Sequence, residues 1–312
     1  MSFLNRFQYH YHTKNIDGFI SSENYDEFFK YLNKFSNNKD LFYKLSLKYI
    51  SKAINSSKNN FINKKIVWIN SFLKNDLDFL NKFFLFYNQG NGFLYRDNQT
   101  YLSAIDDILI KNEEIDFNTF INQSYFFQWM ILNNNNSQNQ FFINELPFFS
   151  TKDNFNFTKP NITQSYIFLL NDPYVVYNNI KTIHDGDQQI ARNVFLNLDN
   201  KPTLENFNKA TFNLSKQGWH TNTLSWTDPN VLNSLKGKII LKKDLIREPY
   251  ETLSSIILHL VQSGVEIELN YDLIEKFVKQ NPISNESGIE VSQKEKKFID
   301  QYIDQILNTY EF

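Results

Sequence analysis

The chain has 312 residues, a formal net charge of −2 and no cysteine, with 41% hydrophobic and 21% charged residues. This balance predicts a folded protein of one large domain or two small ones, and excludes a disordered chain. Without cysteine there are no disulfides and no thiolate chemistry, and the charge gives no case for nucleic acid as a partner. No apolar run approaches the ~20 residues of a membrane helix, and no secretory signal is visible. We therefore expect a soluble, cytoplasmic protein without a membrane span.

Residues 1–60 are expected to form a helical extension that packs on the outside of the core. Apolar residues recur at helical spacing in residues 25–35 and 41–54. His10 and His12 could be considered a metal-binding pair, but side chains two residues apart do not face each other on a helix and are not accompanied by a carboxylate cluster. We predict no metal site there.

The segment 65–87 organises the rest of the chain as a strand, a tight turn and a helix. The run Ile66–Ile69 is apolar and rich in β-branched and aromatic residues, which is typical of a buried strand. Apolar side chains then recur at helical spacing from Leu77 to Tyr87. In α/β proteins, phosphate binds at such a turn, on the N–H groups of the helix N-terminus.

The turn itself has unsuitable chemistry for phosphate. It keeps one cation, Lys74, but it contains no glycine that would let the backbone close around an anion. Asn75 or Asp76 can cap the helix. Asp76 and Asp78 stand where an anion would sit.

Three further strands are predicted after this unit. The polar stretch Asn133–Gln140 and the glycine pair Gly90-Asn-Gly92 are interpreted as loops, and residues 117–132 as a helix. Helices are expected from Pro173, around Trp219 and Trp226, from Pro249 to a glycine stop at Gly264, and over residues 294–310. The strand candidates are Gln140–Ile143, Ser165–Leu170 and Lys238–Leu241. The last two should join Ile66–Phe72 in one parallel sheet, which places a central sheet between helices in residues 61–312 and predicts an α/β fold.

The turn His184-Asp185-Gly186-Asp187 allows two interpretations. An Asp-x-Asp pair can hold a divalent metal on a nucleotide-sugar diphosphate, which would indicate a glycosyltransferase. Asp-Gly is also a common turn pair with no chemical role.

Five segments in order resemble the sulfotransferase family, whose members transfer a sulfuryl group from 3′-phosphoadenosine 5′-phosphosulfate (PAPS) to a hydroxyl or amine. Ile66-Val-Trp-Ile-Asn-Ser-Phe-Leu-Lys74 resembles the strand before the family's Tyr-Pro-Lys-Ser-Gly-x-Thr-Trp loop. Phe141-Phe-Ile-Asn-Glu-Leu-Pro147 and Ser165-Tyr-Ile-Phe-Leu-Leu-Asn-Asp-Pro173 are similar to its Lys-Thr-His-Leu-Pro and Tyr-Ile-x-Arg-Asn-Pro segments. Trp219 and Trp226 match its Trp-x-x-His-x-x-x-Trp helix, and Ile239–Pro249 matches its Arg-Tyr-Glu-Asp-Leu-x-x-x-Pro element. The resemblance implies a P-loop-like α/β fold over residues 64–312.

The resemblance also assigns candidate site residues. Lys74 carries over as the loop lysine that stabilises the leaving phosphate. The family's catalytic histidine falls at Glu145 in an ungapped match, or at Leu146 if the register slips by one residue. Asn75 and Asp76 replace the loop residues that hold the 5′-phosphosulfate of PAPS. Asn171 and Asn179 replace the arginine and serine that grip the 3′-phosphate. No metal is implied, and the acceptor is an unidentified small molecule, glycan or protein.

Two functional hypotheses follow from this comparison. In the first, the chain is a working sulfotransferase, with Glu145 as the general base and Lys74 at the leaving group. In the second, the donor site has been lost, and the retained fold is an inactive binding or interaction module. The predicted loss of phosphate contacts favours poor binding of PAPS.

Overall fold

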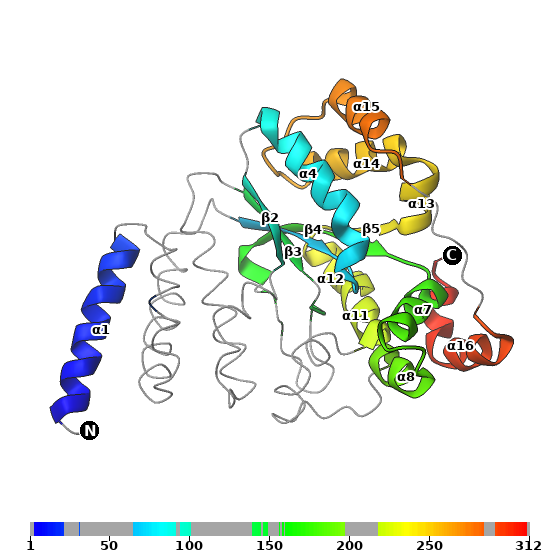
Figure 1. Cartoon of the computed structure of the whole chain (residues 1–312). Coiled ribbons are helices and arrows are strands. Elements are labelled where there is room, and N and C mark those ends of the chain that lie inside the picture. The colour runs from blue at the N-terminus through cyan, green and yellow to red at the C-terminus, as the bar shows by residue number, and fades with distance from the viewer. Residues whose placement is uncertain are drawn as a thin grey trace.

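The structure is a computed structural model of the whole chain, and it describes residues 3–21, 31, 65–91, 94–100, 139–144, 146–148, 156, 158, 160–196, 218–283 and 291–310. Within these residues, five strands are distributed among helices along the chain (Figure 1). The strands are β1 (Lys65–Asn70), β2 (Leu94–Thr100), β3 (Asn139–Asn144), β4 (Thr163–Leu170) and β5 (Gly237–Leu241). The helices are α1 (Phe3–Ser21), η1 (Lys74–Leu77), α4 (Asp78–Asn91), η2 (Pro160–Ile162), α7 (Pro173–Ile183), α8 (Gln188–Leu196), α11 (Gly218–Thr227), α12 (Pro229–Ser234), α13 (Lys242–Arg247), α14 (Pro249–Gln262), α15 (Tyr271–Gln280) and α16 (Gln293–Leu307).

The five described strands form one sheet in the order β2-β3-β1-β4-β5, and every pair is parallel. β1 is central, with Trp68 aligned with Phe142 of β3 and Tyr166 of β4. The chain leaves β1 toward β2 on one side of the sheet and leaves β4 toward β5 on the other. The carboxyl ends of β1 and β4 therefore flank a topological switch point, where ligands of open α/β sheets bind.

Two layers of helices cover the two faces of the sheet. Successive side chains of a strand point to opposite faces, so each strand contributes apolar residues to both layers. Val67 and Ile69 of β1 pack under α4, α14 and α15, which we call the α4 layer. Ile66 and Trp68 face α7, α8, α11 and α16, which we call the α7 layer. Figure 1 shows the two layers on opposite faces of the sheet. All four side chains are fully buried, so β1 is the middle of the core, as its continuous apolar run predicts.

The predicted strands are confirmed, with shifted boundaries. β1 ends at Asn70 and not at Phe72, and the following turn is the short helix η1 before α4. The helices from Pro173, around Trp219, from Pro249 and at 293–307 are also present. Gly264 has φ 84°, the left-handed conformation expected of a glycine that stops a helix.

Some predictions for the first half of the chain are wrong or lie outside the described residues. The glycine pair was expected in a loop, but α4 continues through Gly90 to Asn91, because its buried apolar stripe holds the helix in spite of the glycine. β2 was not predicted, since its sequence Leu-Tyr-Arg-Asp-Asn-Gln-Thr has no apolar run. α1 is a helix, as expected for the N-terminal extension. The predicted helices at 25–35, 41–54 and 117–132 fall largely outside the described residues.

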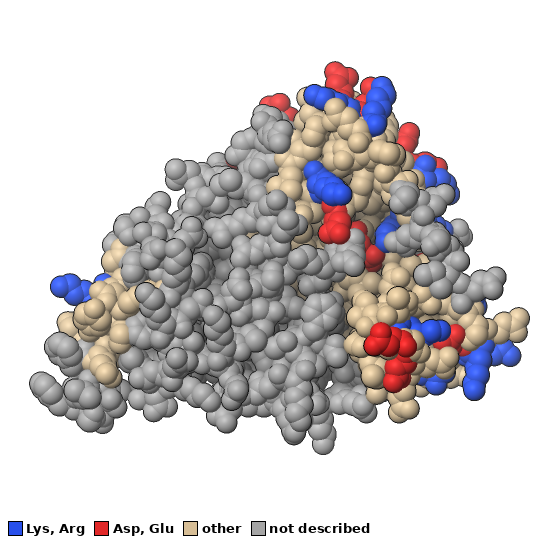
Figure 2. All heavy atoms as spheres, viewed as in Figure 1, with Lys and Arg blue, Asp and Glu red and all other residues tan. Residues whose placement is uncertain are grey.

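Charged side chains on the described surface are mixed in sign. Figure 2 shows lysine and arginine interspersed with aspartate and glutamate on the visible part of this surface. Among the described helices, none combines the length and the apolar character needed to cross a membrane.

Candidate functional site

A buried ion pair lies at the carboxyl edge of the sheet, where three strands deliver polar residues. Lys242 Nζ is 2.7 Å from Asp76 Oδ1, and the two side chains are 14% and 3% exposed. The Asn171 amide nitrogen donates to both carboxylate oxygens of Asp76, at 3.2 Å each. We call Asp76, Asn171 and Lys242 the Asp76 cluster.

The local sequence explains why these three residues meet. Each follows the end of a strand: Asp76 lies in η1 after β1, Asn171 directly follows β4, and Lys242 directly follows β5. In η1, the backbone N–H of Asp76 donates to the carbonyl of Leu73 at 3.1 Å, and Asp76 is buried. Parallel strands end at the same edge of a sheet, so residues 95 and 166 positions away reach the Asp76 side chain.

The charges of the cluster offset each other within the protein. Burial of a carboxylate has an unfavourable free energy of desolvation unless a cation and hydrogen-bond donors interact with it. Here the ammonium of Lys242 and the amide group of Asn171 both donate hydrogen bonds to the Asp76 carboxylate. Asp76 lies two residues before the first residue of α4, and the N-terminus of a helix is the end at which anions bind.

The side-chain oxygen of Asn171 also forms a hydrogen bond within the protein. Its Oδ1 accepts from the backbone N–H of Asp172 at 2.8 Å. The Asp172 carboxylate caps α7, accepting from the N–H of Tyr174 at 2.7 Å and of Val175 at 3.4 Å. The N-terminus of α7 therefore also holds a carboxylate of the chain itself.

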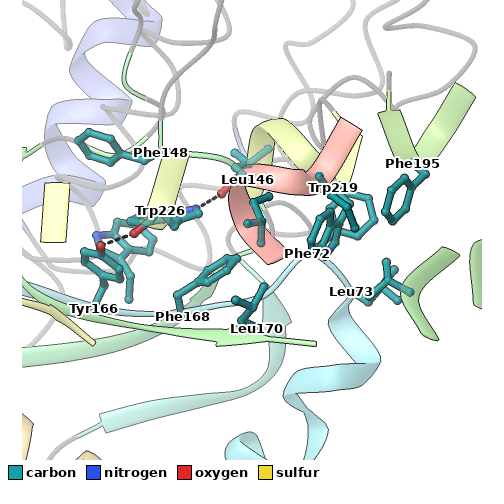
Figure 3. Packing of buried hydrophobic residues seen from close by; sticks show 14 of the residues in the cluster. Phe72, Leu73, Leu146, Phe148, Tyr166, Phe168, Leu170, Phe195, Trp219 and Trp226 are labelled. Carbon is teal, nitrogen blue, oxygen red and sulfur yellow. Dashed lines mark hydrogen bonds between the residues drawn. The ribbon is translucent and has the colours of Figure 1, made fainter. Parts of the chain in front are cut away.

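The loop after β1 is anchored by apolar side chains. Phe72 and Leu73 are 2% and 8% exposed and belong to the core beneath the α7 layer. Figure 3 shows them beside Trp219 and Phe195, whose rings stack at 5.2 Å. A phosphate-binding loop needs its backbone free to surround the anion, whereas this loop is fixed by its burial.

The structure brings together two of the six predicted site residues. Asp76 and Asn171 are in contact, but they bind each other rather than standing open to a donor molecule. Asn179 lies half-buried on α7, two helical turns beyond Asn171. Lys74 and Asn75 belong to η1, and their side chains lie outside the described part, as does Glu145. The proposed catalytic roles of Lys74 and Glu145 remain predictions.

Lys242 is the site residue that sequence reasoning missed. The feature that could have indicated Lys242 is its position directly after the predicted strand Lys238–Leu241, since sites of parallel sheets form at the carboxyl ends of strands. Lys243 follows it and is exposed, and the sequence alone gave no means of choosing between the two lysines.

The other candidate motifs have structural explanations. Asp187 Oδ1 accepts from the backbone N–H groups of Gln189 and Ile190, at 2.8 and 3.0 Å, and so caps α8. Asp185 and Gly186 have φ 53° and 83°, as in a tight left-handed turn. His12 Nδ1 lies 3.0 Å from the hydroxyl of Tyr31. The described residues contain no group of three metal-ligating side chains.

A second polar cluster lies at the amino edge of the sheet. The Ser165 hydroxyl donates to the carbonyl of Lys236 at 2.7 Å, and His259 Nε2 lies 3.0 Å from the same carbonyl and 3.2 Å from the hydroxyl. Burial lowers the pKa of His259, and the nearby Lys238 lowers it further, against a hydrogen bond to Lys236 that raises it. Ser165 is fully buried. The pair therefore joins α14 to the sheet and does not present a nucleophile to solvent.

Comparison with known proteins adds no assignment. The sequence matches no protein-family model and no curated protein.

Proposed function

We propose that this chain is a catalytically inactive protein of sulfotransferase-like fold that acts as a binding module and does not use PAPS. The observation that carries the proposal is the Asp76 carboxylate, which is buried against Lys242 and Asn171 at the switch point of the sheet. In this reading, the protein supplies its own anion where the family binds that of the donor. The five ordered sequence segments and the parallel sheet support the choice of fold.

The neighbouring contacts support loss of the donor site. Asn171, at the position of the 3′-phosphate arginine, uses its amide group on Asp76 and on the backbone of Asp172. Phe72 and Leu73 bury the loop that would surround the 5′-phosphosulfate. Asp78, the first residue of α4, is exposed and adds a second negative charge near the same helix N-terminus.

The expected loss of affinity is large. Charge-assisted hydrogen bonds contribute about 1.5–3 kcal/mol each. The arginine, the loop hydroxyls and the serine of the family are replaced by Asn171, Asp76 and Asn179. Three lost contacts amount to about 5 kcal/mol, or more than a thousandfold in affinity. Repulsion by the carboxylates of Asp76 and Asp78 adds to this loss.

Calorimetric titration of the full chain with 3′-phosphoadenosine 5′-phosphate tests the proposal. We expect no binding heat up to millimolar ligand. A sulfuryl-transfer assay with PAPS and a panel of phenols and amines should likewise give no product. Micromolar binding would show that other residues have taken over the phosphates, and would restore the enzyme hypothesis with Lys74 and Glu145.

A further inference from the structure

Three adjacent parallel strands end in asparagine or are followed directly by one. The three asparagine side chains differ in whether their polar atoms are hydrogen-bonded. Asn144 ends β3, Asn70 ends β1 and Asn171 follows β4, and they are 0%, 1% and 5% exposed. Asn144 Oδ1 accepts from the backbone N–H of Leu146 at 3.0 Å, and its amide group donates to the Leu146 carbonyl at 3.3 Å. Asn171 is paired within the Asp76 cluster. Neither polar atom of Asn70 has a hydrogen-bond partner among the described residues.

The position of Asn70 makes this lack of partners unusual. It lies on the same face of β1 as Trp68, toward the α7 layer. Trp68 is also fully buried, but its indole N–H donates to the Thr163 hydroxyl at 3.1 Å. Buried polar groups in native proteins are nearly always paired, and an exception calls for an explanation such as a bound group.

Three features together point to a ligand: the burial of Asn70, its two unpartnered atoms and its place in the central strand at the switch point. We propose that Asn70 is the recognition group of a small-molecule site at the carboxyl ends of β1, β3 and β4. The inference rests on the proposed function, because the binding module needs a ligand other than PAPS. A residue kept only for packing would be apolar here, as its lateral neighbour Phe168 is.

The chemistry of the amide defines the class of ligand. Asn70 presents an N–H donor beside a carbonyl acceptor in one plane. Its complement is a planar edge with an acceptor beside a donor, as in a primary carboxamide or a pyrimidine imide. The ligand should be neutral, because the two charges of the Asp76 cluster, at the same edge of the sheet, offset each other. Asparagine recognises base edges by the same paired geometry.

Nuclear magnetic resonance on the full chain tests this inference with two probes, uracil and nicotinamide. The side-chain amide signals of Asn70 are assigned by their loss in Asn70→Leu. Millimolar uracil or nicotinamide should shift them, whereas 1,3-dimethyluracil and N,N-dimethylnicotinamide, which lack the N–H donor, should not. A larger shift of the Asn70 signals with uracil indicates an imide ligand, and a larger shift with nicotinamide indicates a carboxamide ligand.

Two variants separate recognition from packing. Asn70→Leu should lose probe binding, while its melting temperature rises by about 2–4 °C, because a buried unpaired amide is removed. The matched variant Asn81→Leu changes another buried asparagine, on α4 in the opposite layer, and should keep probe binding. If Asn70→Leu does not fold, the smaller substitution Asn70→Ser supplies the assignment of the amide signals, and the probe comparison on the unmodified chain then decides the question.

The inference is overturned if neither probe shifts the Asn70 signals, or if the methylated compounds shift them equally. Binding of 3′-phosphoadenosine 5′-phosphate is measured separately. A chain that binds neither the probes nor this nucleotide keeps the proposed loss of the donor site and rejects the role of Asn70. A chain that binds the nucleotide at micromolar concentration rejects the proposed function itself.

Discussion

The two edges of the sheet solve the problem of burying polar groups differently. At the carboxyl edge, two opposite charges and one neutral amide, from three separate elements, meet in the Asp76 cluster. At the amino edge, Ser165 and His259 share the backbone carbonyl of Lys236 without a buried ion pair. The contact at the amino edge is thus made by a hydroxyl, an imidazole and a backbone carbonyl. At the carboxyl edge, by contrast, the stability of the fold depends on each buried charge having its partner. Parallel sheets place their sites at the carboxyl edge, and in this chain Asp76, Asn171 and Lys242 at that edge are bound to each other.

The largest effect should come from removing the cation of the Asp76 cluster. Lys242→Met leaves the buried carboxylate without its charge partner, and we expect the free energy of unfolding to fall by about 3–5 kcal/mol. The control Lys243→Met removes an exposed lysine from the next position and should change stability by less than about 0.5 kcal/mol. Denaturant titration measures both.

A double variant tests whether the charges act as a pair. Asp76→Asn with Lys242→Met removes both charges, and its loss of stability should be smaller than the sum of the two single losses. Additive losses would show that the ion pair contributes nothing specific, and the contrast between the two edges would disappear.

The next largest effect is expected at the amino edge, from Gly237→Ala. A methyl group at Gly237 would collide with the ring of Tyr166, which is buried and held by its hydrogen bond to the Trp226 carbonyl (Figure 3). Overpacking of this kind costs about 1–3 kcal/mol. Gly18→Ala in α1 meets no atom within 4 Å and should cause no loss. Equal thermal stability of Gly237→Ala and the unmodified chain would argue against this packing.

A smaller effect should follow from Ser165→Ala. The variant removes one hydrogen bond to the Lys236 carbonyl, but His259 still reaches the same oxygen. We expect a loss of about 0.5–1.5 kcal/mol in the free energy of unfolding. A loss as large as that of Lys242→Met would contradict the distinction drawn between the edges.

The smallest effect concerns pH. Burial lowers the pKa values of His259 and His220 below the ordinary value of 6.5. The unfolded chain therefore takes up these protons first as pH falls, so stability is complete above pH 6.5 and declines as pH decreases toward the folded-state pKa values. His259→Gln should flatten the dependence of the melting temperature on pH, because it removes one of the two histidines whose pKa is lowered by burial. An unchanged slope in His259→Gln would show that its burial has no thermodynamic consequence.

Sequence reasoning predicted most of the framework, because apolar runs such as Ile66–Ile69 and helical stripes report burial directly. It missed β2, which has no apolar run. The candidate site was predicted only in part. Asp76 and Asn171 were recognised from their positions, but their mutual contact and that with Lys242 depend on the order of strands. That order is not visible in local sequence.

The most direct test of the central claim compares two aspartates that stand two residues apart. The claim is that Asp76 occupies the place of an anion, whereas Asp78 is only an exposed charge nearby. Calorimetry with 3′-phosphoadenosine 5′-phosphate on Asp76→Ala and Asp78→Ala measures the difference, since each variant removes the same charge. We predict that Asp76→Ala gives binding heat at millimolar nucleotide, whereas Asp78→Ala, like the unmodified chain, gives none, which corresponds to a difference of at least about tenfold in affinity, or about 1.4 kcal/mol. Equal affinity of the two variants would contradict the claim.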